Sequence, residues 1–391
     1  MAKRVFPSAV GVVAAAVMGA GLLTCGPASA STSASWTVQH MPPPLTEVTQ
    51  VPGVSCITGG TCTAVGYYDQ LGLTNRFFAE PFAERKTSGG GWTVQSVAPV
   101  PPEDAGFLLA VSCTSAAFCM AVGQTVVSET SGAQPLSETW DGTAWAIQPV
   151  PDPPGGGSVG LAGVSCTSAT FCMAVGTSVE NQGPEETLAE IWDGSTWTIA
   201  PTADGFANAS FNGVSCPSPA TCIAVGRYVG TAGIEPLAES WNGSNWSTQP
   251  VPSPAGAGGL LSAVSCSSAT ACTTVGFYFS SPTTTALIDR WNGTRWKEQT
   301  DPGRDIPVGV SCPTARNCTS VGLANPSAPA PTAESWNPAS GWTIDATAVP
   351  GRAAASRLQA VSCLSPANCT ATGYFDNKGV KQLGQPLAEH G

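Results

Sequence analysis

Val264-Ser265-Cys266-Ser267-Ser268-Ala269-Thr270-Ala271-Cys272-Thr273-Thr274-Val275-Gly276 recurs in variant form seven times along the 391-residue chain. In every copy two cysteines enclose five residues, and a glycine follows four residues after the second cysteine. Such regular repetition predicts an architecture built from one supersecondary unit. The seven pairs are Cys56/Cys62, Cys113/Cys119, Cys166/Cys172, Cys216/Cys222, Cys266/Cys272, Cys312/Cys318 and Cys363/Cys369.

The cysteine pairs predict disulfides. Two strands joined by five residues bring their ends to the separation that a disulfide needs, and each short loop would contribute about 2 kcal/mol. Zinc sites instead prefer cysteines about two to four residues apart with four converging ligands, and redox sites prefer Cys-x-x-Cys. We therefore expect seven structural disulfides and no metal site.

A second motif follows each pair, for example Leu136-Ser137-Glu138-Thr139-Trp140-Asp141-Gly142-Thr143-Ala144-Trp145. In the unit of the opening stretch we expect four short strands, at 260–266, 272–278, 286–291 and 296–300. Asn292-Gly293 is a strong tight-turn signal between the last two strands. No segment after the N-terminal 30 residues keeps a 3.6-residue apolar period, so we expect essentially no helix there.

Seven four-stranded units predict an all-β fold, a seven-bladed β-propeller of antiparallel strands. The seventh unit ends within its third strand, while Ser35-Trp36-Thr37-Val38-Gln39 matches the fourth strand at Trp92-Thr93-Val94-Gln95. We expect this N-terminal strand to complete the last blade and close the ring, which removes exposed sheet edges. The expected blades within the domain 31–391 are about 45–97, 106–150, 159–201, 210–251, 260–300, 306–347 and 358–390 plus 34–40.

The units resemble the kelch repeat, the propeller unit also found in galactose oxidase. The shared order is a small-apolar strand, Val-Gly, an acidic residue, an aromatic residue, a turn, Trp and prolines, over about residues 35–390. Two departures are single glycines, such as Gly66, Gly123 and Gly226, where kelch units carry Gly-Gly, and the cysteine pair itself. The Trp-Asn-Gly-x-x-Trp element is similar to the Asp-box of sialidase-type propellers without its Ser-x-Asp start. The cysteine pattern also resembles that of uncharacterised exported bacterial propellers.

The first 30 residues are typical of a secretory signal. Lys3 and Arg4 precede the apolar run 10–23, and Ala28-Ser29-Ala30 is a small-residue cleavage site. We expect a signal peptide at 1–30 and secretion of the mature chain, which would keep 14 of the 15 cysteines. The alternative is a lipid anchor at the cell surface through Cys25, since Leu22-Leu23-Thr24-Cys25 resembles a lipobox. We expect no membrane span elsewhere.

The composition and the absence of known motifs argue against several classes of function. A net charge of −11 argues against nucleic-acid binding. The only histidines, His40 and His390, are too few for a histidine-based triad or a copper site like that of galactose oxidase. No phosphate-loop, EF-hand or zinc signature occurs, so we expect no cofactor. The leading hypothesis is a secreted, non-enzymatic binding module. The alternative is a sialidase- or glycosidase-type hydrolase with a site at the channel mouth.

Residues that recur in every blade are assigned to the scaffold, because a site must break the symmetry of the ring. The acidic residue of the third strand fits glycosidase chemistry, but its repetition favours hydrogen bonding to a neighbouring strand or turn. The tryptophan pairs fit sugar stacking, but packing between blades explains them better. The repeated acids are Glu84, Glu138, Glu190, Glu239, Asp289, Glu334 and Glu389.

Candidate binding residues are the non-repeated ones on the face that carries the loops from second to third strand and from blade to blade. They form an acidic, tyrosine-bearing set, and we expect an unknown protein or carbohydrate ligand and a monomeric chain. The set is Tyr67, Tyr68, Asp69, Arg76, Glu103, Asp104, Arg227, Tyr228 and Tyr278. Glu180, Glu185 and Glu186 are further non-repeated residues of the same face.

Overall fold

The structure is a computed structural model. It divides the chain into Met1–Thr32 and a second unit, Ser33–Gly391, to which all that follows refers. The described residues are 35–43, 48–70, 78–101, 104–128, 132–154, 157–180, 183–203, 205–231, 233–252, 258–280, 283–303, 305–324, 330–351, 353–377 and 384–391. The predicted signal peptide at 1–30 and the alternative anchor Cys25 lie outside them.

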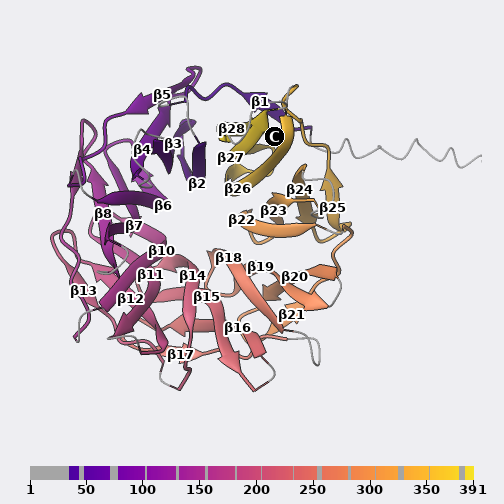
Figure 1. Cartoon of the computed structure of the whole chain (residues 1–391). Coiled ribbons are helices and arrows are strands. Elements are labelled where there is room, and N and C mark those ends of the chain that lie inside the picture. Colours follow the sequence, from indigo (N-terminus) through magenta and orange to yellow (C-terminus); the bar gives the residue numbers. More distant parts are fainter. Residues whose placement is uncertain are drawn as a thin grey trace, which may run out of the picture. The chain divides into compact units, whose positions relative to one another are not determined.

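Seven four-stranded antiparallel sheets are arranged as the blades of a ring (Figure 1), and no helix occurs among the described residues. Blade 1 consists of β2 (Val48–Ile57), β3 (Thr61–Gln70), β4 (Phe78–Lys86) and β5 (Trp92–Gln95). Blade 2 consists of β6 (Ala105–Ser115), β7 (Phe118–Ser128), β8 (Gly132–Trp140) and β9 (Trp145–Ile147). Blade 3 consists of β10 (Gly157–Ser168), β11 (Phe171–Glu180), β12 (Glu185–Trp192) and β13 (Trp197–Ile199). The predicted seven-bladed propeller is confirmed.

The remaining blades repeat this order from centre to rim. Blades 4 and 5 consist of β14 (Ser210–Ser218), β15 (Thr221–Gly230), β16 (Gly233–Trp241) and β17 (Trp246–Thr248), and of β18 (Gly258–Ser268), β19 (Ala271–Ser280), β20 (Thr283–Trp291) and β21 (Trp296–Glu298). Blades 6 and 7 consist of β22 (Ile306–Thr314), β23 (Asn317–Leu323), β24 (Pro331–Asn337) and β25 (Gly341–Asp345), and of β26 (Ala353–Ser365), β27 (Asn368–Asn377), β28 (Gly384–His390) and β1 (Thr37–Gln39).

The N-terminal strand closes the ring, as predicted. β1 pairs with β28, and the register places Thr37 opposite His390. Trp36 is only 4% exposed and packs in the core of blade 7. The last blade therefore combines the two ends of the described chain in one sheet.

The disulfides lie at the end of each inner hairpin, and all seven predicted pairs are formed. In blade 5, Cys266 and Cys272 face each other directly across β18 and β19, with Cα atoms 3.9 Å apart. This agrees with the expected role as a local staple. Seven disulfides indicate an oxidising compartment. The other bridges are Cys56–Cys62, Cys113–Cys119, Cys166–Cys172, Cys216–Cys222, Cys312–Cys318 and Cys363–Cys369.

The second cysteine of every pair lies in the core of the ring, with an exposed fraction of 0–4%. The sequence pattern predicted the bridge but not this burial. A ligand cannot reach these sulfur atoms. Unlike the candidate binding residues, the second cysteines therefore have only a structural role. The seven buried cysteines are Cys62, Cys119, Cys172, Cys222, Cys272, Cys318 and Cys369.

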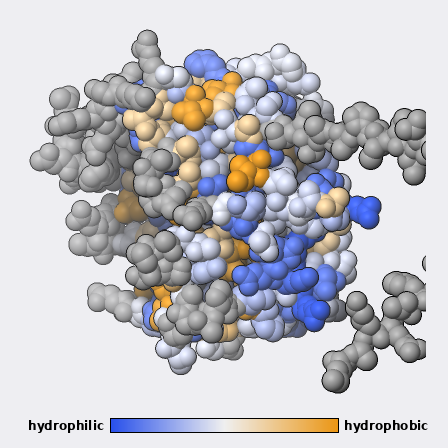
Figure 2. Space-filling model, turned by 90° about the vertical axis from the view of Figure 1, so that its right-hand side faces the viewer, coloured by the Kyte–Doolittle hydropathy of each residue, from blue (hydrophilic) through white to orange (hydrophobic). Residues whose placement is uncertain are grey.

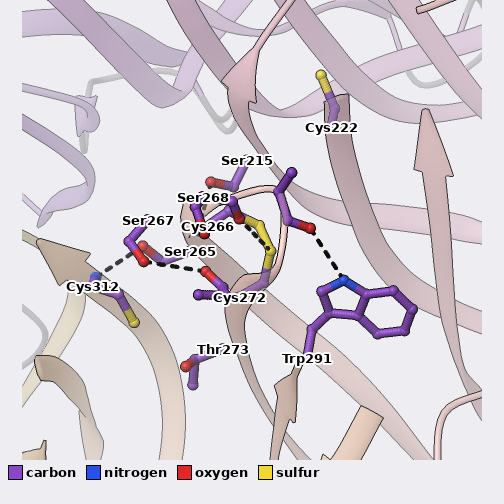
Figure 3. Close-up of a disulfide and its surroundings, with 12 residues drawn as sticks. Ser215, Cys222, Ser265, Cys266, Ser267, Ser268, Cys272, Thr273, Trp291 and Cys312 are labelled. Atoms are coloured by element: carbon purple, nitrogen blue, oxygen red, sulfur yellow. Dashed lines mark hydrogen bonds between the residues drawn. A yellow bond between two sulfur atoms is a disulfide. The ribbon is translucent and has the colours of Figure 1, made fainter. Parts of the chain in front are cut away.

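The serine before each first cysteine links one blade to the next. Ser265 Oγ accepts a hydrogen bond of 2.9 Å from the backbone N–H of Cys312 in the following blade (Figure 3). The same bond recurs at every interface and forms a closed circle. The other pairs are Ser55–Cys113, Ser112–Cys166, Ser165–Cys216, Ser215–Cys266, Ser311–Cys363 and Ser362–Cys56.

Close approach of the inner strands explains their small residues. A Cβ added to Gly163 of blade 3 would lie 3.0 Å from the Cα of Gly213 in blade 4. Side chains larger than that of alanine at such positions would separate the strands that surround the axis. In blades 1 to 6, short turns join the third and fourth strands at the outer end of the blade. In the Asp-Gly turn of blade 2, Asp141 Oδ1 accepts from the backbone of Thr143 and Ala144.

The outer surface is mixed in character. On the side shown in Figure 2, hydrophobic patches are separated by polar surface. Within the described part of the chain, the structure contains no helix with the length and apolar composition of a membrane span.

Candidate functional site

Two of the predicted binding residues, Tyr68 and Asp104, line the same pocket. It has a volume of about 690 Å³ and lies against blade 1 and the linker to blade 2. Its walls combine aromatic, aliphatic and proline side chains with two carboxylates, and both charged side chains of this lining are acidic. The lining consists of Tyr68, Glu80, Pro81, Phe82, Val94, Gln95, Ser96, Val97, Ala98, Pro99, Val100, Pro101 and Asp104.

The polar wall of this pocket is set by a tyrosine–glutamate pair. Tyr68 near the end of β3 donates its hydroxyl proton to Glu80 Oε2 of β4 at 2.5 Å. The two residues are directly paired in the antiparallel ladder, so the sheet itself holds them together. The linker wall is held in place from the next blade, where Glu138 Oε2 accepts from the backbone N–H of Ala98 at 3.0 Å.

Blade 4 repeats the pair in a smaller cavity of about 240 Å³. Tyr228 donates to Glu235 Oε2 at 2.6 Å, and this hydrogen bond raises the pKa of Tyr228 to about 12. Phe206 packs on the Tyr228 ring with 4.5 Å between the ring centroids, so an aromatic side chain occupies part of this space. The pair in blade 4 thus offers an internal comparison for the pocket of blade 1.

The other predicted site residues do not gather at that pocket. Tyr67 packs edge-on against Phe107 of blade 2, with 4.8 Å between ring centroids. Arg227 of β15 forms a 2.9 Å ion pair with Glu185 of blade 3. Tyr278 of β19 is partly buried against the core of blade 5. Figure 1 places β15 and β19 across the ring from β3.

Three predicted residues have no described side chain. Arg76 and Glu103 lie outside the described residues, and Asp69 is described only as part of the backbone of β3. The set predicted from sequence therefore corresponds to several separate places in the structure. Glu80 and the linker 96–101, which define the blade 1 pocket, were missed. The recurrence of Tyr with Glu-Pro in blades 1 and 4, as Glu80-Pro81 and Glu235-Pro236, was the available signal.

The central channel offers no acid–base pair among its described lining residues. The cavity of about 250 Å³ is lined by short segments of all seven inner strands, mainly Gly, Ala, Val, Leu and Pro, with Asn212, Ser262 and Gln359 as polar members. The hydrolase hypothesis requires two carboxylates about 5–10 Å apart at the channel mouth. No Asp or Glu belongs to this lining.

The seven repeated carboxylates are buried in the blades, with exposures of 0–4%. The predicted hydrogen bonds are found in part: Glu239 accepts from the backbone of Ala203 and Glu389 from that of Ala348, both in the preceding linker. Both carboxylate oxygens of Glu84, Glu190 and Asp289 have no hydrogen-bond partner among the described residues. Burial raises the pKa of Glu84 and Glu190 to about 8, and it raises that of Glu138, Glu239, Asp289 and Glu389 to about 7. The pKa of Glu334 is also raised, by burial and then by Asp301. They belong to the scaffold.

Most of the repeated tryptophans are equally buried. Trp140, Trp145, Trp192, Trp197, Trp241 and Trp246 are 4–6% exposed. Where the indole N–H is bonded, it donates within the chain, as Trp192 Nε1 does to the Ala169 carbonyl of the disulfide loop at 3.1 Å. A sugar cannot stack on rings that are covered in this way, so these six are packing residues.

The arrangement defines an all-β protein of the seven-bladed propeller class. No protein-family model matches the chain, and no curated protein matches it. Its fold is similar to that of the solved structure described as YCF48 bound to D1 peptide, at 14% identity and a TM-score of 0.53, covering 91% of this chain and 96% of that one. It is also similar to YCF48 from Cyanidioschyzon merolae, at 13% identity and a TM-score of 0.54, covering 91% and 99%. At these identities the similarity shows the fold, and the kelch-type assignment stays a prediction.

Proposed function

We propose that this chain is a secreted, non-enzymatic propeller that binds an extended peptide segment of a partner protein, and that the blade 1 pocket is its contact site. The observation that carries the proposal is the pocket itself. Its volume of about 690 Å³ falls in the range of ligand sites, and apolar walls with a few placed polar groups are typical of them.

The chemistry of the walls favours a particular kind of peptide. Val94 and Val100 offer apolar contact, while Glu80 and Asp104 place two carboxylates in the same lining. A basic side chain next to apolar residues would complement both features. The solved YCF48 structure with a D1 peptide supports the proposal by analogy, since it is a propeller described with a bound peptide.

A selection from random peptides tests this function. The oxidised protein is immobilised and used to select from a phage-displayed library of random peptides, and affinities are then measured by fluorescence polarisation. We expect enriched peptides that carry Lys or Arg beside apolar residues. Replacement of Tyr68 by Ala, or of Glu80 and Asp104 by Gln and Asn, should weaken them by about tenfold or more.

The matched control is Glu235→Gln in blade 4, which alters the equivalent pair and should leave these affinities unchanged. Failure to enrich any peptide would remove the proposed function. Peptides that bind the Glu80/Asp104 double variant as tightly as the wild type would remove the assignment to blade 1.

A further inference from the structure

Two arginines make the same contact at two different blade interfaces. Arg85 of β4 lies with its Cζ 5.0 Å from the ring centroid of Trp140 in blade 2, and Arg290 of β20 lies 3.2 Å from that of Trp336 in blade 6. Each also donates from Nη2 to a carbonyl of the next blade's disulfide loop, Ala116 at 2.7 Å and Ala315 at 2.9 Å. A guanidinium that stacks on an indole and bonds a carbonyl uses both its face and its edge.

Strand register defines the equivalent position in the other blades. In blades 1 to 6, one residue of the third strand lies opposite the second cysteine, as Trp291 lies opposite Cys272 in blade 5. Both arginines stand immediately before that residue in the sequence. Blades 2 and 3 carry Thr139 and Ile191 there. In these blades a phenylalanine packs in the core with the next tryptophan instead, Phe118 with Trp192 and Phe171 with Trp241.

The interface between blades 4 and 5 has neither residue. Ser240 stands at the arginine position and Thr221 at the phenylalanine position. The tryptophan of the next blade, Trp291, is only partly buried, whereas Trp192 and Trp241 are 4% and 6% exposed. Among the described residues, no arginine or lysine makes a cation–π contact with Trp291.

The two groups that hold Arg85 are nevertheless present at Trp291. In blade 2 the Ala116 carbonyl accepts from both Arg85 and Trp140 Nε1. In blade 5 the corresponding carbonyl, that of Ala269, accepts from Trp291 Nε1 at 3.3 Å (Figure 3). A carbonyl oxygen has two lone pairs, so it can take a second donor.

We propose that Trp291 and the Ala269 carbonyl form a binding site for an arginine side chain of a partner protein. The chain's net charge of −11 favours a basic partner. The site lies beside the disulfide loop, at the opposite end of the strands from the Tyr68 pocket. It therefore goes beyond the proposed function and does not depend on it.

The test uses fluorine NMR on protein labelled with 5-fluorotryptophan, with Trp291→Phe to assign the Trp291 signal. The probe is Nα-acetyl-arginine methylamide, and the matching lysine derivative is the control. We expect the arginine probe to shift the Trp291 signal saturably and the lysine probe to bind about tenfold more weakly. Ser240→Arg should abolish the response, because its own guanidinium occupies the site.

A reciprocal variant keeps the test decisive if Ser240→Arg fails to fold. Arg290→Ser removes the guanidinium over Trp336 and should make a second signal, that of Trp336, respond to the probe. The proposal is overturned if Trp291 does not respond to the arginine probe, and also if Trp336 does not respond in a folded Arg290→Ser variant. A folded Ser240→Arg variant that responds like the wild type also overturns it, and equal shifts with the lysine probe overturn the guanidinium assignment.

Discussion

Ser362 Oγ in the last blade accepts a hydrogen bond of 2.9 Å from the backbone N–H of Cys56 in the first blade, although the two residues are 306 positions apart. This bond is the one of the seven serine–cysteine links that crosses the seam of the ring. It therefore joins the beginning and end of the repeat array by the same contact that joins sequential blades. Loss of this contact should weaken the interface between the last blade and the first.

Ser362→Ala should lower the free energy of unfolding by about 1–2 kcal/mol, because the Cys56 N–H loses its partner at a packed interface. Urea denaturation measures the change. Ser247→Ala, at an exposed position on β17, is the control and should cost less than about 0.5 kcal/mol. Equal effects of the two variants would contradict a structural role for the closed circle of bonds.

Trp36→Ala should destabilise the protein by about 3–5 kcal/mol, since it removes a large side chain that is 4% exposed in the core of blade 7. Val38→Ala on the adjoining strand β1 is a suitable comparison, because Val38 is 42% exposed. Chemical denaturation followed by tryptophan fluorescence gives both values. If the two substitutions cost the same, the N-terminal segment does not close the ring through the burial of Trp36.

The 14 paired cysteines should resist alkylation by iodoacetamide in the native, unreduced protein, and mass spectrometry reads this directly. Replacing Cys266 and Cys272 together by Ser should cost about 2 kcal/mol on the loop-entropy model. Free thiols at these positions would contradict the disulfide assignment.

Stability should fall as the pH rises from about 5 to about 8. The buried carboxylates have folded-state pKa values of about 7–8, above the usual Glu value of about 4.3 in an unfolded chain. The folded state therefore binds more protons in this window, and its advantage is lost as the pH passes the folded pKa values. Melting temperatures across this range measure the slope.

Glu190→Gln should reduce that slope, because an amide stays neutral throughout. Asp141→Asn serves as the contrasting variant: hydrogen bonds from the Thr143 side chain and neighbouring backbone lower the pKa of Asp141 to about 2, so it does not titrate between pH 5 and 8. A flat melting temperature over this window would refute the carboxylate explanation.

The predicted signal peptide should be cleaved after Ala30, so that the mature chain begins at Ser31. N-terminal sequencing or intact mass decides between this outcome and a lipid-modified chain that begins at Cys25. Ala30→Phe, which spoils the small-residue site, should slow processing at Ser31 and would have no such effect on a chain cut before Cys25.

Much of the fold follows from local patterns. The Cys-x5-Cys spacing, the Asp-Gly and Asn-Gly turns and the match of Trp36 to Trp92 predict hairpins, blade number and ring closure. These features act within one blade or repeat in all of them, so the sequence displays them many times. The scaffold role of the repeated acidic residues also follows, because a residue that recurs in all seven blades cannot mark a single site.

The candidate sites depend on contacts between blades, which have no fixed spacing in the sequence. Tyr68 and Asp104 share a pocket because the linker 96–101 crosses from the rim of blade 1 to the centre of blade 2, whereas Arg227 is engaged by Glu185 of a neighbouring blade. Likewise, Ser240 matters only because Trp291 lies in the next blade with part of its surface uncovered. Repetition alone determined the ring, and the packing of unlike side chains across its interfaces decided where the candidate sites lie.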